Sequence, residues 1–300
     1  MARLPQERRR TELRNPASRG LDRMSTEAVL RVINREDQKV AIAVGREIPS
    51  IAKAVDAIVA GIRKGGRLIY VGAGTSGRLA ILDASECPPT YGVSRQLVQG
   101  LIAGGRKAVT GAVEGAEDSA ANGVRDLKAK KILREDIVVG IAASGTTPYV
   151  LSALEFARKR GATTVAVTAN RKSPLAKHAC IVIAVEVGPE VVTGSTRMKA
   201  GTSQKLVLNM LSTASMVRLG HVYDNLMIDL TLTNEKLLQR GVRVLMEASG
   251  AESSAAAHAL RQSGHDVRVA LTMLKTGTNA KAARTRLRLA NGNLRQALGE

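Results

Sequence analysis

The chain has 300 residues, of which 44% are apolar, so it can bury the core of one large domain or of two ordinary ones. Its net charge of +19 would suit nucleic acid, but aromatic residues make up only 2% of the chain and Trp is absent, which leaves no platform for stacking bases. Because two cysteines cannot form a disulfide framework and the apolar runs are too short to cross a bilayer, we expect a cytoplasmic protein with no membrane partner and no specific nucleic-acid partner.

The N-terminal part, residues 1–49, is expected to form an arm followed by helices. Residues 1–25 are polar, rich in Arg and interrupted by two prolines, which favours an extended arm over a packed element. Apolar residues then recur at helical spacing over residues 26–34 and 39–62. Pro49 should break or kink the second of these stretches.

The central part, residues 50–233, alternates short apolar runs with helical stretches. Runs rich in β-branched residues cover residues 67–71, 98–103, 137–142, 164–168 and 180–185. Such runs are typical of strands that are buried on both faces. The pattern predicts the α/β class, with a doubly wound parallel sheet between two helical layers, an αβα sandwich.

The C-terminal part, residues 234–300, has only helical periodicity. We expect helices over residues 234–248, 253–262, 266–274 and 280–297. Gly250, Gly264 and Gly277 separate them and suit C-terminal caps. This part is therefore predicted to be a small helical domain.

A glycine-rich loop follows the first predicted strand. Gly72, Gly74 and Gly77 match the GxGxxG pattern of dinucleotide sites, but the second strand ends in Gly-Gly-Arg, without the acidic residue that would hold a ribose. Thr75, Ser76 and Gly77 instead offer hydroxyls and N–H groups at a helix N-terminus, which suits a single phosphate. The alternative is a tight turn whose hydroxyls only cap the helix.

A second hydroxyl-rich loop follows the third predicted strand. Ser144, Gly145 and Thr147 lie in it, and Ser144 and Thr147 could either cap the next helix or bind an anion. Ligands of open parallel sheets bind at the carboxyl ends of the strands, where both loops should lie. The expected ligand is therefore a phosphorylated small molecule.

Two acidic segments lie between these loops. Glu86 precedes a Cys-Pro-Pro turn that would fix the backbone, and Glu117 lies in a Glu-Gly-Ala-Glu-Asp run. Single carboxylates are usually solvated surface groups, so both interpretations stay open here. Arg197 and Lys199 also have two possible interpretations: they contact an anion, or they are charges at the start of a helix. Neither cysteine lies in a cluster with metal spacing, and no metal or cofactor is expected.

Several long motifs resemble the N-acetylmuramic acid 6-phosphate etherase family. They are LIYVGAGTSGRLAILDASECPPTYG (68–92), VEGAEDS (113–119), VVGIAASGTTPYV (138–150) and EVVTGSTRMKAGTSQKLVLNMLST (190–213), with TELRNPASRGLDRMST (11–26) near the N-terminus. The resemblance covers nearly the whole chain. It implies a sugar isomerase (SIS) domain that forms homodimers with sites near the interface, followed by a UBA-like three-helix module.

The resemblance also implies a reaction. N-acetylmuramic acid 6-phosphate and water would give N-acetylglucosamine 6-phosphate and D-lactate, a cofactor-free carbon–oxygen lyase reaction of cell-wall sugar catabolism and peptidoglycan recycling. Glu86 matches the family's acid/base proton donor, and Glu117 its second active-site glutamate. The phosphate-loop positions of SIS domains match Ser76, Ser144, Gly145 and Thr147. Thr146 stands where the family commonly has Arg, so the ionic contact that an Arg would offer to phosphate is lost at this position.

Three other functions compete with this one. A non-catalytic SIS regulator would bind a phosphosugar and act on a partner, but it would not need both Glu86 and Glu117. An aldose–ketose isomerase of the same fold would release no lactate. An SIS transcription factor would need a helix-turn-helix domain before the sheet, for which the segment before the first predicted strand, beginning with the polar arm, leaves little room.

Overall fold

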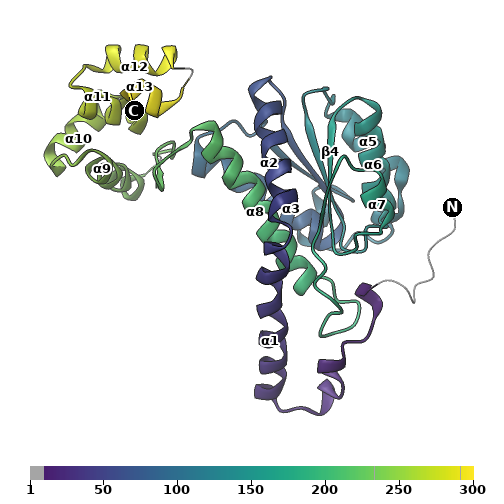
Figure 1. Ribbon diagram of the computed structural model, residues 1–300. Helices are drawn as coiled ribbons and strands as arrows, with labels where there is room; N and C mark the ends of the chain where they lie inside the picture. The colour runs from purple at the N-terminus through teal and green to yellow at the C-terminus, as the bar shows by residue number, and fades with distance from the viewer. Residues whose placement is uncertain (1–9, 233, 291) are drawn as a thin grey trace. The chain divides into compact units, whose positions relative to one another are not determined.

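The computed structural model describes residues 10–232, 234–290 and 292–300 (Figure 1). The chain forms two compact units, one made of Met1–Ser85 and Gln96–Ser212 and the other of Glu86–Arg95 and Thr213–Glu300. In the described ranges, no helix combines the length and the apolar character that a membrane span requires.

The segment before the first long helix folds into short helical turns, although most of its side chains are exposed. Three short 3-10 helices form it: η2 (Arg10–Glu12), η3 (Pro16–Ser18) and η4 (Leu21–Arg23). Asn15 is 6% exposed, caps η3 by accepting from the Ala17 N–H, and donates from its own amide to Glu36 and Pro189. The expected arm therefore contains short helical turns over residues 10–25, anchored by the buried Asn15, while most of its side chains stay exposed; residues 1–9 lie outside the described chain.

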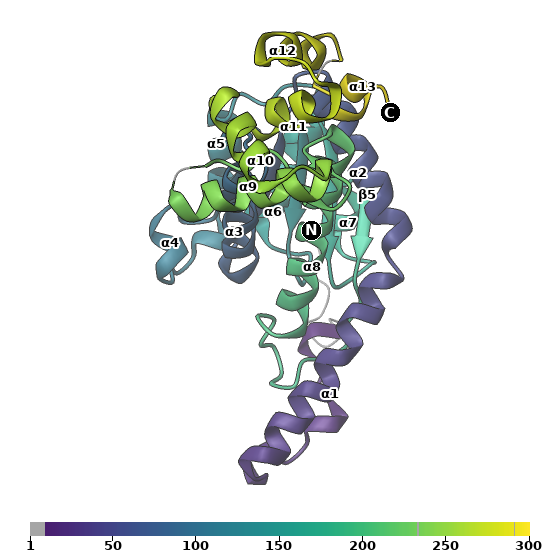
Figure 2. The same cartoon turned by 90° about the vertical axis from the view of Figure 1, so that its left-hand side faces the viewer.

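Two helices lead into the sheet. α1 (Thr26–Gly45) begins at Ser25, whose hydroxyl caps it, and runs without a break through residues 35–38. α2 (Ile48–Arg63) has Pro49 in its first turn, so the predicted break lies just before the proline, where a missing N–H costs nothing. α1 extends well beyond the sheet in two perpendicular views (Figures 1 and 2).

Five parallel strands form the central sheet. They are β1 (Leu68–Gly72), β2 (Val98–Ile102), β3 (Ile137–Ile141), β4 (Thr163–Thr168) and β5 (Ile181–Ala184). Their order is β2-β1-β3-β4-β5, and β1 and β3 are fully buried. All five predicted strands are present within one residue at each end, because runs buried on both faces carry a strong signal.

Helices cover both faces of the sheet. α5 (Ala120–Ala129), α6 (Pro148–Lys159) and α7 (Pro174–Lys177) lie on one face, and α2, α3 (Gly74–Tyr91) and α8 (Lys199–Leu219) lie on the other (Figure 1). Two short elements, α4 (Lys107–Thr110) and η5 (Ala116–Asp118), connect β2 to α5. The predicted fold class, a doubly wound αβα sandwich with a helical C-terminal part, is confirmed.

The C-terminal part consists of a short hairpin and a helical bundle. Its elements are β6 (Val222–Tyr223), β7 (Leu226–Met227), α9 (Glu235–Ser249), α10 (Ser253–Gln262), α11 (Val267–Thr276), α12 (Ala280–Leu289) and α13 (Leu294–Leu298). The five helices form one group in both views (Figures 1 and 2). Gly250 and Gly277 cap α9 and α11 in the left-handed conformation, as predicted. The single helix predicted over residues 280–297 is instead two helices.

Candidate active site

The candidate site lies at the carboxyl edge of the sheet, where the strand order reverses. β1 pairs with β2 on one side and with β3 on the other, and the last residues of β1 and β3, Gly72 and Ile141, are opposite each other. α3 and α6 follow these two strands. A parallel sheet of this order has its ligand crevice between β1 and β3, beyond their carboxyl ends. The two hydroxyl-rich loops, which follow β1 and β3, therefore both lie at this edge of the sheet.

In the first loop, the glycines are required by close packing of α3 against the sheet. A Cβ atom on Gly72 would lie 2.7 Å from the Gly77 nitrogen, and one on Gly77 would lie 2.5 Å from Cγ1 of Ile102. Gly74 begins α3 with a φ of +52°. The GxGxxG pattern thus brings a helix N-terminus to the strand end, where the first N–H groups of α3 have no partner in the helix.

Ser76 is the buried hydroxyl of this loop. It is 8% exposed, and its Oγ donates to Oε1 of Gln204 in α8 over 2.8 Å. Thr75 is partly exposed, and its Cγ2 would lie 3.5 Å from a Cβ atom on Gly201, so α8 packs beside the loop. Gln204 is not predictable from the sequence, because 128 residues separate it from Ser76 and no local pattern marks it.

The second loop is tightly folded around Gly145. This residue has a φ of +68°, and a Cβ atom on it would lie 2.3 Å from the Ser173 hydroxyl, so only glycine fits. Ser144 and Thr146 join their hydroxyls over 2.9 Å, and the Thr146 N–H donates to Ser144 over 3.3 Å. Thr146 therefore orients Ser144, a task that an Arg at this position would not perform in the same way.

Thr147 occupies the N-cap position of α6 without capping it. Its side chain makes no cap hydrogen bond, and Pro148 follows as the first helical residue. The simple capping role considered for Thr147 is therefore not what its hydroxyl does. The residue lies at the N-terminus of α6, at the carboxyl edge of the sheet, a position that suits an anion.

Glu117 lies close in the chain to residues that pack on the start of α6. It is exposed in η5, between Gly115 and the α5 cap Ser119. A few residues later, the Ala120 carbonyl accepts from the Ser152 hydroxyl over 2.7 Å. The segment that carries Glu117 is thereby attached to the helix that follows the second loop.

Arg78 connects this segment to the first loop. Its guanidinium donates to the carbonyl oxygens of Ala108 (3.1 Å), Val109 (3.0 Å) and Gly111 (2.8 Å), at the end of α4. One side chain of α3, the helix that begins in the first loop, thus fixes the chain six residues before Glu117.

Glu86 is exposed on α3, farther along the helix. Ten residues separate it from Ser76, a rise of about 15 Å at 1.5 Å per residue. About three turns of α3 thus separate Glu86 from the first loop along the helix.

Asp83 lies one turn before Glu86 in a different environment. Its carboxylate accepts from Oη of Tyr70 over 2.9 Å and from Oγ of Ser212 over 3.0 Å. Burial raises the pKa of Asp83 to about 6, although both hydrogen bonds act in the opposite direction. α3 thus carries one enclosed carboxyl group and one exposed carboxylate.

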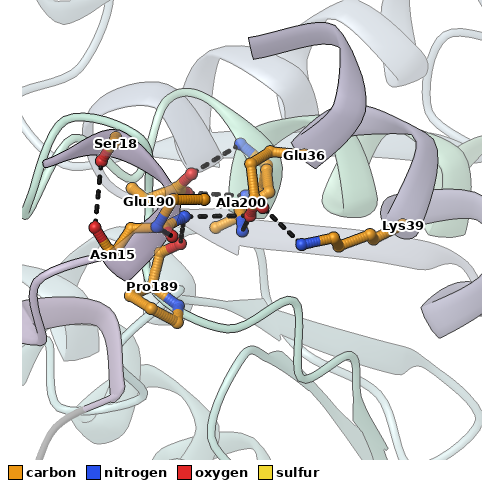
Figure 3. Close-up of polar contacts among 9 residues, drawn as sticks. Asn15, Ser18, Glu36, Lys39, Pro189, Glu190 and Ala200 are labelled. Atoms are coloured by element: carbon orange, nitrogen blue, oxygen red, sulfur yellow. Dashed lines mark hydrogen bonds and ion pairs between the residues drawn. The ribbon is translucent and has the colours of Figure 1, made fainter. Parts of the chain in front are cut away.

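A buried ionic network fixes the start of α8 (Figure 3). Lys199, 1% exposed, donates from Nζ to Glu36 over 2.5 Å, and Glu36 also accepts from Asn15 and Lys39. Burial alone would raise the pKa of Glu36, but these donors lower it to about 2. This buried ion pair supports the interpretation of Lys199 as a structural charge at the start of α8 rather than as an anion contact. Arg197 is exposed.

Within the residues that the structure describes, no three His, Cys, Asp or Glu side chains converge as they would around a metal ion. The donors at the crevice are hydroxyls and N–H groups, which suit an anion rather than a cation.

Family models match the chain along most of its length. The glucokinase regulatory protein N-terminal SIS domain matches residues 50–158, the SIS domain matches residues 117–214, and the C-terminal lid domain of glucokinase regulatory protein matches residues 224–290. Among solved structures, the phosphoheptose isomerase of Neisseria gonorrhoeae is 15% identical with a TM-score of 0.51 and covers 64% of this chain and 98% of its own. That of Francisella tularensis is 19% identical with a TM-score of 0.51 and covers 65% and 100%. The SIS fold is thereby shown.

Curated relatives match over almost their full length. The N-acetylmuramic acid 6-phosphate etherase of Aeromonas hydrophila subsp. hydrophila is 56% identical over 286 residues, which are 95% of this chain and 96% of that protein. The etherase of Yersinia pestis is 54% identical over 288 residues, 96% of this chain and 98% of that protein. By this identity the chain belongs to the N-acetylmuramic acid 6-phosphate etherase family.

Proposed function

We propose that the protein cleaves the D-lactyl ether of N-acetylmuramic acid 6-phosphate, giving N-acetylglucosamine 6-phosphate and D-lactate. The observation that carries the proposal is the 56% identity to an etherase over 95% of the chain. The hydroxyl-rich loops at the β1/β3 crevice support it, because they offer donors to the sugar phosphate. The residues proposed to bind the phosphate are Thr75, Ser76, Gly77, Ser144, Gly145 and Thr147.

The proposed mechanism is an elimination followed by an addition of water. Ring opening gives the aldehyde, which acidifies the proton on C2. A carboxylate removes this proton while a carboxylic acid protonates the departing lactate oxygen, and water then adds to C3 of the unsaturated aldehyde. We assign the proton transfers to Glu86, as the donor, and Glu117. Each transfer contributes a factor of about 10² to 10⁴ in rate, and none of them needs a metal or cofactor.

The assembly proposed for this reaction is a homodimer. Glu86 lies about 15 Å along α3 from Ser76, so a second subunit would offer another way to bring a glutamate to the phosphate. In a homodimer, Glu86 of one subunit can serve a phosphate that is bound by the other. We place this dimer in the cytoplasm, where the thiols of Cys87 and Cys180, which form no disulfide, stay reduced, and we propose no specific nucleic-acid or membrane partner.

A second candidate is a non-catalytic regulator that binds a phosphosugar. It is favoured by the two matches to domains of glucokinase regulatory protein. Both candidates share the phosphate site and differ only in whether a bond is broken.

Incubation with N-acetylmuramic acid 6-phosphate separates the two. We expect release of D-lactate, with deuterium at C2 of the product in heavy water and labelled oxygen at C3 in oxygen-18 water. Binding without lactate release would support the regulator, and labelled oxygen in lactate would contradict elimination.

The glutamates are tested by Glu86→Gln and Glu117→Gln. Each keeps the size of the side chain and removes its acid/base function, so lactate release should fall at least about 10²-fold while the melting temperature stays nearly unchanged. Binding of N-acetylglucosamine 6-phosphate, measured by calorimetry, should persist. Full activity in either variant would contradict its assignment.

A further inference from the structure

Ser76 and Gln204 form a buried hydrogen bond between the phosphate loop and α8. Oγ of Ser76 donates to Oε1 of Gln204 over 2.8 Å, and the two residues are 8% and 3% exposed. A buried hydroxyl or amide without a hydrogen-bond partner costs free energy of folding. The bond to Gln204 therefore limits which other partners the Ser76 hydroxyl can take.

This bond conflicts with the binding of phosphate by Ser76. A hydroxyl has one proton, and a phosphate oxygen without a proton only accepts. While the Ser76 hydroxyl donates its proton to Gln204, it cannot donate a hydrogen bond to a phosphate.

The amide of Gln204 can resolve the conflict. It carries an acceptor, Oε1, and a donor, Nε2, at nearly the same distance from the helix. If the amide turns by half a rotation, Nε2 donates to Oγ of Ser76 and the Ser76 proton becomes available to the ligand.

We propose that Gln204 is a positioning residue of the sugar-phosphate site, which directs the Ser76 hydroxyl proton. It accepts this proton when the site is empty and donates to Ser76 when phosphate is bound. The proposal rests on the phosphate site proposed above and adds α8 to its two loops.

The backbone that carries Gln204 is held firmly, which leaves the amide as the part that turns. The Glu190 carboxylate accepts from the N–H groups of Lys199 (3.0 Å) and Ala200 (2.9 Å) at the start of α8 (Figure 3). The Lys199–Glu36 pair fixes the same turn. Gln204 lies in the next turn, three residues after Gly201, which packs near Thr75.

Two substitutions separate proton direction from packing. Gln204→Met keeps the approximate volume but neither accepts nor donates, so Ser76 is no longer oriented. Gln204→Glu accepts only, when ionised, so it keeps the Ser76 proton and places a negative charge beside the phosphate. The matched control is Ser203→Ala, because the Ser203 hydroxyl is equally buried in α8 but donates to the Ala200 carbonyl of its own helix.

The probes are inorganic phosphate and N-acetylglucosamine 6-phosphate, with binding measured by calorimetry after a thermal melt has shown that each variant is folded. We expect affinity for both probes to fall about tenfold in Gln204→Met and about a hundredfold in Gln204→Glu, and to stay unchanged in Ser203→Ala. In turnover, KM should rise while kcat stays nearly constant.

A double-mutant cycle tests whether Gln204 acts through Ser76. In a Ser76→Ala background, Gln204→Met should cause no further loss of affinity. An additional tenfold loss there, or unchanged affinity in both Gln204 variants, would overturn the proposal. If the wild-type protein bound neither probe, the phosphate site itself would be contradicted; phosphate binding without lactate release would contradict only the etherase activity.

Discussion

Asp83 makes the stability of the protein depend on pH in a direction opposite to that of most carboxylates. Its pKa of about 6 in the folded chain lies above the unfolded value near 3.8. Between about pH 3.8 and pH 6 the folded state therefore keeps the Asp83 proton that the unfolded state has lost. The stabilisation by the protonated carboxyl group is complete below about pH 3.8 and is lost as pH rises through 6.

Asp83→Asn removes this titration and keeps one acceptor for Tyr70 or Ser212. Relative to the wild type, its free energy of unfolding should improve by on the order of 2 kcal/mol between pH 4 and pH 7. Chemical denaturation at a series of pH values measures the difference. A difference that does not change with pH would show that the carboxyl of Asp83 is not held protonated.

At the scale of residues, local patterns and tertiary contacts were not equally predictable. Gly72, Gly77 and Gly145 lie in segments that the sequence already marks by their glycines. In the structure a neighbouring atom comes so close to each of them that a Cβ atom would not fit. Lys199 and Gln204 resemble ordinary polar residues of a helix, and their partners are 163 and 128 residues away. Such pairings exist only after the chain has folded, so the sequence alone left Lys199 open and gave no sign of Gln204.

At the scale of elements, the start of α8 depends on a buried charge pair. Removing one partner of such a pair leaves the other charge without compensation, which costs about 3–5 kcal/mol. Lys199→Met should therefore lower the free energy of unfolding by that amount. The double variant Glu36→Leu/Lys199→Met should regain most of the loss, because it buries no charge.

The matched control for this experiment is Lys39→Met. Lys39 also donates to Glu36, but its side chain is 61% exposed. Its loss should cost less than about 1 kcal/mol. Equal losses for Lys39→Met and Lys199→Met in urea denaturation would contradict the special role of the buried pair.

The elements themselves were predictable to different degrees. Strands β1 to β5 are short, buried on both sides and bounded by polar turns, so their positions followed from the sequence. The polar residues 35–38 interrupt the apolar pattern of α1, yet the helix continues because Glu36 has its partners in Lys199 and Asn15. The sequence predicts a single helix where the structure has α12 and α13, because Arg and Leu continue at helical spacing up to the end of α12 at Leu289.

At the scale of the whole molecule, the extent of the C-terminal unit is open to a direct test. The sequence predicts a domain of residues 234–300, but the core cluster of this part also includes Tyr223, Ile228 and Leu230, which pack with Leu245 and Leu260. Burying a side chain such as Ile228 contributes about 1.5–3 kcal/mol. The fragment 213–300 should therefore melt cooperatively and at a higher temperature than the fragment 234–300, as followed by circular dichroism. Equal melting temperatures would support the boundary at residue 234.

The Lys199–Glu36 pair also has a consequence for the history of the sequence. A mutation of either codon alone leaves one buried charge without its partner and makes the protein less stable. Replacing both residues together leaves no unpaired buried charge. Selection should then remove most single changes and retain double ones. In an alignment of many relatives, positions 36 and 199 should vary together, although 163 residues separate them.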